Sequence, residues 1–171
     1  MAKVQLVVTD VDGVHTDDTV LLGMVNGERI ELYRFITCDG IVIRECLRHN
    51  IPVVFISGRK APAVKQRAED LGARCLQGIV DKVEAVSEII NELGLGWNQV
   101  LFIGNDIQDI SLIRQVGFSA APRDAAPEAR SEADYVTEKK GGEGVVREVL
   151  QMMLEVKGMW DPILARERTL G

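Results

Sequence analysis

Residues 4–13 of the chain read Val4-Gln5-Leu6-Val7-Val8-Thr9-Asp10-Val11-Asp12-Gly13. The run of Val and Leu is typical of a strand that is buried on both faces of a parallel sheet. Asp10 and Asp12 follow this strand and are separated by one residue, Val11. An unpaired buried carboxylate is costly, and two neighbouring ones repel each other. A divalent cation such as Mg²⁺, which prefers hard oxygen ligands, would resolve this conflict. The alternative is an ordinary turn with Asp at its cap and Gly at a positive φ.

The rest of the chain alternates short β-rich runs with longer helical patterns, which is typical of a parallel sheet covered on both faces. We expect further strands at 51–56 and 100–103, weaker ones at 74–76, 118–120 and 135–136, and helices near 40–49, 61–72, 82–93, 109–115 and 144–156. The pattern predicts an α/β fold, a three-layer, Rossmann-like parallel sheet, in one domain over residues 1–158.

Two segments fall outside this alternation. Residues 14–35 contain two short apolar runs on either side of Asn26-Gly27, a strong turn signal, so we expect an inserted β-hairpin near the end of the first strand. The tail, residues 159–171, shows no clear apolar period and is expected to be mobile.

Composition limits the classes of function. The chain has 171 residues, 46% of them hydrophobic, and a net charge of -6. An acidic chain without a basic block is a poor match for nucleic acid. Its apolar runs are far shorter than the ~18 residues that a membrane span needs. Three cysteines without a Cys-x-x-Cys pair fit free thiols in a reducing compartment. The sequence therefore predicts a cytoplasmic protein that binds a small molecule, with neither a nucleic-acid nor a membrane partner.

Polar side chains follow the other two strong strands as well. Ser57-Gly58-Arg59-Lys60 comes after the second strand, where a hydroxyl and free N–H groups can bind an oxyanion. Gly104–Asp109 follows the third strand and supplies amide and carboxylate oxygens. Lys82 begins a helix, where a bound phosphate would relieve its conflict with the helix dipole. Ligands of open parallel sheets bind at the carboxyl ends of the strands. Taken singly, these segments have ordinary alternatives: a helix-capping Ser, an Asx-type cap and a surface Lys.

An acid pair, then Ser-Gly, then Lys, then a second acidic segment is an order that resembles the haloacid dehalogenase-like (HAD-like) phosphohydrolases. The chain is most similar to their small capless branch that acts on 3-deoxy-D-manno-octulosonate 8-phosphate (KDO 8-phosphate). The resemblance covers about residues 4–155 and is carried by Thr9–Val14, Asp39-Gly40, Ser57–Ala61, Gln77-Gly78 with Lys82, Ile103–Asp106, Ala133–Thr137 and Gly141–Val149. It implies a HAD-like fold without a cap domain and a Mg²⁺-dependent phosphomonoesterase that forms an aspartyl-phosphate intermediate.

The resemblance assigns catalytic roles by position. Asp10 would be the nucleophile, and Asp12 would be the general acid and base. Ser57, the Gly58 amide and Lys82 would hold the transferring phosphoryl group and stabilise its charge. Asp10 and Asp12, the latter through its backbone carbonyl, would also bind the metal ion.

The resemblance also implies further ligands. Asn105 and Asp106 would complete the Mg²⁺ site, and Asp109 lies close enough in sequence to take part. Arg59 and Arg67 resemble side chains that face the sugar acid, whose carboxylate a guanidinium can bind through two hydrogen bonds.

The chain departs from the family pattern at four positions. Asn105 stands where the family usually has Asp, so this ligand would bring no charge to the metal. Cys38, Val42 and His15 differ near the expected sugar pocket, which leaves two alternatives open. One is a phosphatase for a nine-carbon sugar acid 9-phosphate of the sialic acid type. The other is a non-catalytic oligomerisation module like those attached to some acylneuraminate cytidylyltransferases.

The same resemblance implies that the hairpin takes part in assembly. Capless relatives form tetramers in which the hairpin joins a neighbour's and helps to close the neighbouring active site. Leu21, Leu22 and Met24 on an isolated ribbon would otherwise be an association hazard. We therefore interpret them as interface residues and expect a homotetramer.

Overall fold

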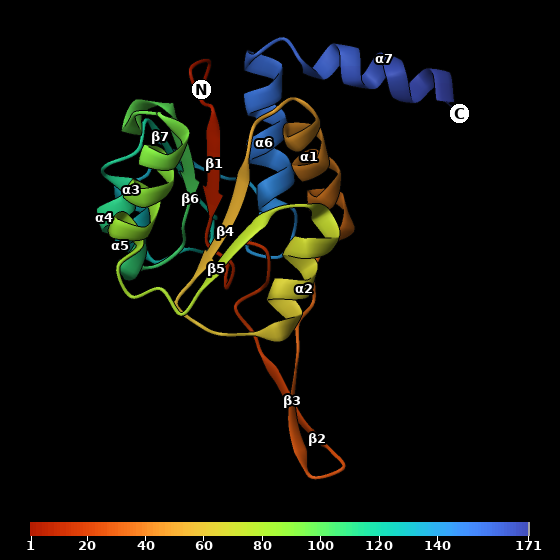
Figure 1. The fold of residues 1–171 in the computed structure, drawn as a ribbon, viewed down its shortest axis with the longest axis vertical. Helices are drawn as coiled ribbons and strands as arrows, with labels where there is room; N and C mark the ends of the chain where they lie inside the picture. The colour runs from red at the N-terminus through yellow and green to blue at the C-terminus, as the bar shows by residue number, and fades with distance from the viewer. Residues whose placement is uncertain (171) are drawn as a thin grey trace.

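The structure, a computed structural model, describes residues 1–170. Its centre is a six-stranded sheet in the order β5-β4-β1-β6-β7-β8, in which every adjacent pair is parallel (Figure 1). The strands are β1 (Leu6–Thr9), β4 (Val53–Ser57), β5 (Arg74–Gln77), β6 (Val100–Ile103), β7 (Phe118–Ala121) and β8 (Tyr135–Val136). The three strands with the strongest sequence signal, β1, β4 and β6, are adjacent at the centre of the sheet.

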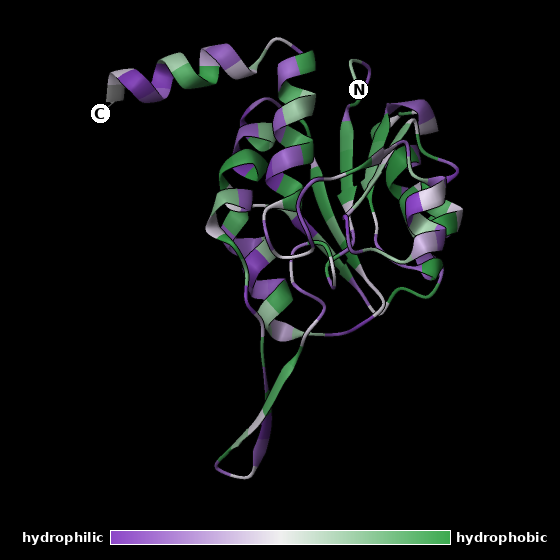
Figure 2. Ribbon diagram, turned by 180° about the vertical axis from the view of Figure 1, so that it is seen from behind, coloured by the Kyte–Doolittle hydropathy of each residue, from purple (hydrophilic) through white to green (hydrophobic). Residues whose placement is uncertain are grey.

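Helices cover both faces of this sheet, as the alternation of strand and helix patterns predicts. On one side lie α1 (Thr37–Arg48), α2 (Pro62–Leu71) and α6 (Val145–Val156), and on the other α3 (Lys82–Leu93), α4 (Ile110–Ile113) and α5 (Pro127–Glu132). Two short 3₁₀ helices, η1 (Trp97–Gln99) and η2 (Ile107–Asp109), flank β6. Val7 faces the first layer of helices, whereas Leu6 and Val8 face the second. This burial of both strand faces explains the continuous apolar runs, and Figure 2 shows the central strands as hydrophobic.

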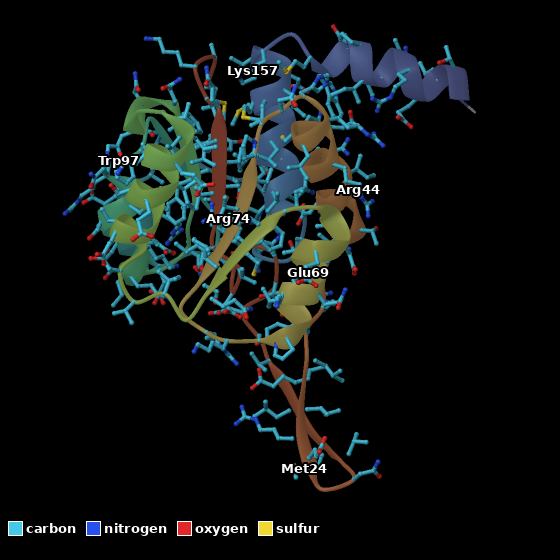
Figure 3. The ribbon with its side chains drawn as sticks, in the orientation of Figure 1. Met24, Arg44, Glu69, Arg74, Trp97 and Lys157 are labelled. Carbon is cyan, nitrogen blue, oxygen red and sulfur yellow. The ribbon has the colours of Figure 1, made fainter. Side chains whose placement is uncertain are left out.

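The predicted hairpin is present and extends away from the body of the molecule (Figure 1). It consists of β2 (Leu21–Val25) and β3 (Glu28–Leu32), which form a separate antiparallel sheet. Asn26 and Gly27 join them with φ values of 51° and 83°, which is the two-residue turn that Asn-Gly favours. Met24, labelled in Figure 3, lies in the outer part of the hairpin and is 67% exposed.

The carboxyl-terminal segment differs from the prediction. Instead of a mobile tail it contains a helix, α7 (Trp160–Leu170), that continues from α6 after a short turn. Trp160 and Ile163 are buried with the core under α6, and Arg166 forms an ion pair of 2.7 Å with the buried Glu45 of α1. Trp160 and Ile163, with the half-buried Leu164 beside them, are the apolar residues of α7 that pack on the core, and three positions among charged neighbours are too few to show a clear period.

Within residues 1–170, no helix combines the length and the apolar character that crossing a bilayer requires.

Candidate active site

The carboxyl ends of β1, β4 and β6 bring the three predicted polar segments together. Thr9, the last residue of β1, lies between Phe55 of β4 and Ile103 of β6. The next residue, Asp10, donates its N–H to the carbonyl of Ile103 at 2.8 Å, which fixes the start of the loop that carries Asp12. The parallel register therefore places the acid pair between the Ser57 segment and the Asn105 segment, as the sequence predicts.

Lys82 lies at the centre of a buried charge cluster. Its Nζ is 2.9 Å from Oδ1 of Asp10 and 2.6 Å from Oδ1 of Asp109, and all three side chains are at most 4% exposed. Asp109 is tied down on its other side, because its Oδ2 accepts the N–H groups of Asn105 and Asp106 at 2.8 and 3.2 Å. One cation is thus shared by two carboxylates, which leaves a net negative site.

Burial is the largest single influence on the pKa of each of these groups. Burial, together with the charge of Asp109, raises the pKa of Asp10 to about 7, although Lys82 lowers it. For Lys82 itself, burial lowers the pKa, but the carboxylates of Asp10 and Asp109 outweigh it and the net direction is upward. Lys82 is therefore a cation at neutral pH. Burial also raises the pKa of Asp12, against the charges of Arg59 and Lys82.

Two buried oxygens beside this cluster have unused hydrogen-bonding capacity. Among the described residues, neither Oδ1 of Asp12 nor Oδ1 of Asn105 has a hydrogen-bond partner, although both atoms are buried. Orphaned buried acceptors of this kind require an explanation, and a bound cation or substrate supplies one. Gly13 makes room for Asn105, since a Cβ at Gly13, whose φ is +75°, would lie 2.0 Å from the Asn105 amide nitrogen.

The donor set fits a divalent cation with oxygen ligands. Asp10 and Asp12 follow the central strand, and Asn105 adds a neutral amide oxygen. No three His, Cys, Asp or Glu side chains within residues 1–170 form a cluster suited to a metal. A site built by this chain would therefore depend on Asn105 and backbone carbonyls as well as on carboxylates.

The Ser57 segment forms the opposite wall of the site. Ser57 is buried, and its Oγ accepts the N–H of Arg59 at 3.1 Å. Helix α2 begins only at Pro62, with Ala61 at its N-cap, so Ser57 is not the helix cap that the ordinary alternative would require. The Arg59 side chain forms an ion pair of 3.3 Å with Glu31 of the hairpin. Sequence reasoning missed this contact, which ties the hairpin to the edge of the site.

The remaining predicted residues lie in different situations. Asp106 is exposed, and its Oδ1 accepts the N–H of Ile107 at 2.7 Å, so it caps η2, whereas Asn105 offers the free buried oxygen. Arg67 is partly buried; it donates to the carbonyl of Ile36 at 3.4 Å and lies over the ring of Phe35. The role of Asp109 as the second partner of Lys82 was not predicted. Its position three residues after Asp106, as in a capping box, is the only sequence signal for it.

His15 is part of the packing beneath the site. It is buried, its Nε2 lies 2.8 Å from the hydroxyl of Thr9, and its ring lies 4.1 Å from that of Phe55. Burial, assisted by the positive charge of Arg67, lowers its pKa to about 3, so the imidazole is neutral at physiological pH. His15 therefore contributes to the packing beneath the site as a buried, neutral side chain.

Comparisons with known proteins agree with this geometry. A model of the haloacid dehalogenase-like hydrolases matches residues 73–149. The 3-deoxy-D-manno-octulosonate 8-phosphate phosphatase of Salmonella typhi is 40% identical over 160 residues, which cover 93% of this chain and 84% of the relative. The enzyme of the same name from Yersinia pestis is 41% identical over 154 residues, which cover 90% and 81%.

Solved structures give the same result. A structure of the Moraxella catarrhalis 3-deoxy-D-manno-octulosonate 8-phosphate phosphatase in complex with magnesium, phosphate and KDO has a TM-score of 0.91 and 30% identity, covering 96% of this chain and 94% of that one. A Yersinia pestis structure has a TM-score of 0.89 and 38% identity, covering 94% and 85%. The chain therefore belongs to the 3-deoxy-D-manno-octulosonate 8-phosphate phosphatase family of the HAD-like hydrolases.

Proposed function

We propose that the chain is a Mg²⁺-dependent phosphomonoesterase that hydrolyses a phosphorylated 2-keto-3-deoxy sugar acid, with KDO 8-phosphate as its substrate. The observation that carries this proposal is the buried cluster of Asp10, Lys82 and Asp109 with the free oxygens of Asp12 and Asn105 beside it. Family membership supports the same chemistry.

The residues of the site can divide one difficult hydrolysis into two steps. The carboxylate of Asp10 attacks phosphorus, and the bond between phosphorus and the sugar oxygen breaks as Asp12 gives its proton to that oxygen. Asp12, now ionised, takes a proton from a water molecule that attacks the aspartyl-phosphate. Inorganic phosphate leaves, and both carboxyl groups return to their starting states. The raised pKa of Asp12 suits this alternation of acid and base.

Charge on the phosphoryl oxygens is stabilised by fixed groups. Lys82 is held in place by two carboxylates and cannot swing away when the substrate binds. The hydroxyl of Ser57 and the amide of Gly58 lie at the opposite wall and add hydrogen-bond donors. Asp10, the carbonyl of Asp12 and Asn105 would hold Mg²⁺, with Asp106 as a further candidate. When bound, the ion neutralises phosphoryl charge and keeps Asp10 ionised.

Arg59 and Arg67 are the proposed partners of the sugar acid. Arg59 stands at the edge of the site, where its guanidinium retains free N–H groups beside the ion pair with Glu31. Arg67 engages the carbonyl of Ile36 and would have to turn to reach the substrate. We therefore expect Arg59 to contribute more than Arg67 to the discrimination between sugar acids and neutral sugar phosphates.

The test is phosphate release from KDO 8-phosphate, a nine-carbon sugar acid 9-phosphate and a neutral hexose 6-phosphate, with and without Mg²⁺. We expect Mg²⁺-dependent turnover that is highest with KDO 8-phosphate and is lost in Asp10→Asn. Asp161→Asn, an exposed carboxylate of α7, serves as the matched control. Preference for the nine-carbon ester would overturn the substrate, and turnover in Asp10→Asn would overturn the nucleophile. Absence of turnover with every ester would favour the non-catalytic module, which the neutral Asn105 makes the second candidate.

Assembly through the hairpin is the second part of the proposal. Leu21, Leu22 and Met24 are 63%, 63% and 67% exposed, more than a stable ribbon in water would leave uncovered. We expect a homotetramer in light scattering and its dissociation when all three are changed to Ser. Val156→Ser, at an apolar position of α6 that is 54% exposed, is the control. A monomeric wild type would refute this role.

A reducing cytoplasmic location completes the proposal. Cys38, Cys46 and Cys75 are all free thiols, as the sequence predicts, and proteins of oxidising compartments usually pair their cysteines.

A further inference from the structure

Asp39 is a buried carboxylate that the proposed mechanism does not use. It lies in the first turn of α1, is 2% exposed, and its Oδ1 accepts the N–H of Arg147 in the first turn of α6 at 2.8 Å. The residue before α6 is Gly144, with φ of +102°, which has no side chain that could cap the helix. Asp39 therefore supplies from a different helix the anionic acceptor that α6 needs at its amino terminus.

The loop that leads into α6 lies directly on the loop that carries Asp12. The N–H of Gly142 donates to the carbonyl of Val14 at 3.1 Å. A Cβ at Gly141 would lie 2.2 Å from the carbonyl oxygen of Gly13, and one at Gly142 would lie 2.6 Å from the nitrogen of Asp17. The two backbones are thus in contact without intervening side chains, so a movement of one is transmitted to the other.

A continuous set of contacts consequently runs from α1 to the catalytic loop. Asp39 holds the start of α6, the start of α6 fixes residues 141–144, and these support residues 13–17 immediately after Asp12. We infer that Asp39 is a positioning residue that holds Asp12 in place for proton transfer to the leaving group. This inference rests on the proposed role of Asp12 as the general acid.

The surroundings of Asp39 disfavour its charged form, because the side chain is buried away from water. Burial raises its pKa to about 6, while the N–H of Arg147 and the positive charges of Arg67 on α2 and of Arg147 itself lower it. Within the described residues its second oxygen, Oδ2, is buried without a partner. An apolar side chain would be less costly at this position, so a carboxylate here points to a requirement for its acceptor oxygen.

The test compares two leaving groups in Asp39→Ala. An alkyl phosphate such as KDO 8-phosphate needs a proton on its leaving oxygen, whereas p-nitrophenolate leaves without one. We expect kcat for the alkyl ester to fall by about ten- to a hundredfold, the range that small misplacements cost. The single-turnover release of p-nitrophenolate should stay within about twofold of wild type, since Asp10 still attacks. Asp39→Asn should restore kcat, because its amide oxygen can accept the same N–H.

A second pair of variants tests the contact from the other side. Arg147→Pro removes the N–H that Asp39 accepts, at a position in the first helical turn where proline is tolerated, and should reproduce the loss. Arg147→Ala keeps the N–H and should therefore leave kcat for the alkyl ester unchanged. Equal losses for both esters, or unchanged kcat in both Asp39→Ala and Arg147→Pro with the fold intact by circular dichroism, would overturn the inference. A wild type inactive on every ester would instead refute the proposed function.

Discussion

The buried position of Lys82 makes its removal the most informative single perturbation. In Lys82→Met the aliphatic stem is kept, but Asp10 and Asp109 lose the cation that lies 2.9 and 2.6 Å from them. Removal of one partner from a buried ion pair typically costs about 3–5 kcal/mol. In a chain of this size each kcal/mol shifts the midpoint of thermal unfolding by about 2–4 °C. We therefore expect a midpoint about 10 °C lower, measured by calorimetry at pH 7.5 without divalent ions.

Two further measurements separate electrostatics from packing. The double variant Lys82→Met/Asp109→Asn removes one of the two carboxylate charges that Lys82→Met leaves without a cation. The amide oxygen of the new Asn at position 109 can still accept the N–H groups of the Asn105 segment. The double variant should therefore be more stable than Lys82→Met alone. Saturating Mg²⁺ should recover part of the loss, because a ligand that binds the folded state stabilises it. A loss below about 1 kcal/mol in Lys82→Met, or a double variant no more stable than the single one, would refute this account of the cluster.

Four other perturbations give independent checks. The raised pKa of Asp39, about 6, contributes a fall of up to about 3 kcal/mol in the unfolding free energy as pH rises from 4 to 6, and Asp39→Asn should remove this contribution in urea denaturation. The lowered pKa of His15, about 3, has the opposite effect on stability. The contribution of the neutral His15 to the unfolding free energy is complete above pH 6.5 and is lost as pH falls towards 3. His15→Gln should therefore lose less stability than wild type between pH 6.5 and pH 4. Asn105→Asp adds a charge beside the free buried oxygen and should lower the Kd for Mg²⁺ by about tenfold in calorimetric titration; unchanged affinity would exclude position 105 as a ligand. Trp160→Ala should cost about 3 kcal/mol, and a loss under about 1 kcal/mol would show that α7 docks without stabilising the core.

The central sheet could be predicted from sequence because its strands are buried on both faces. Residues 53–56 and 100–103 are continuous apolar runs for this reason, and the Asn26-Gly27 turn fixes the hairpin locally. Helix α5 was missed because its six residues are fewer than two turns and show no period. Helix α7 was missed because its packing rests on Trp160 and Ile163 among charged neighbours.

The candidate site could be predicted where topology alone brings residues together. Asp10, Ser57 and Asn105 each follow a central strand, so the parallel register places them at one edge. The contacts between Glu31 and Arg59 and between Asp39 and Arg147 join elements that are distant in sequence, and no local pattern specifies them. The sequence carried one usable signal for the contact between Asp39 and Arg147. Helix α6 is preceded by Gly144 instead of Ser or Asp, so the N–H groups of its first turn need a side-chain acceptor from another element.

The hairpin has a consequence for how such proteins diversify. All ten of its strand residues are exposed or half-buried, and within residues 1–170 their strand pairing is with each other alone, while Glu31 forms the ion pair with Arg59 of the main body. Neither hydrophobic core cluster contains a strand residue of the hairpin, so packing of the main body does not require particular side chains there. Exchange of the hairpin sequence for that of a relative would therefore alter the proposed contact with a neighbouring subunit and leave the core of the main body unchanged.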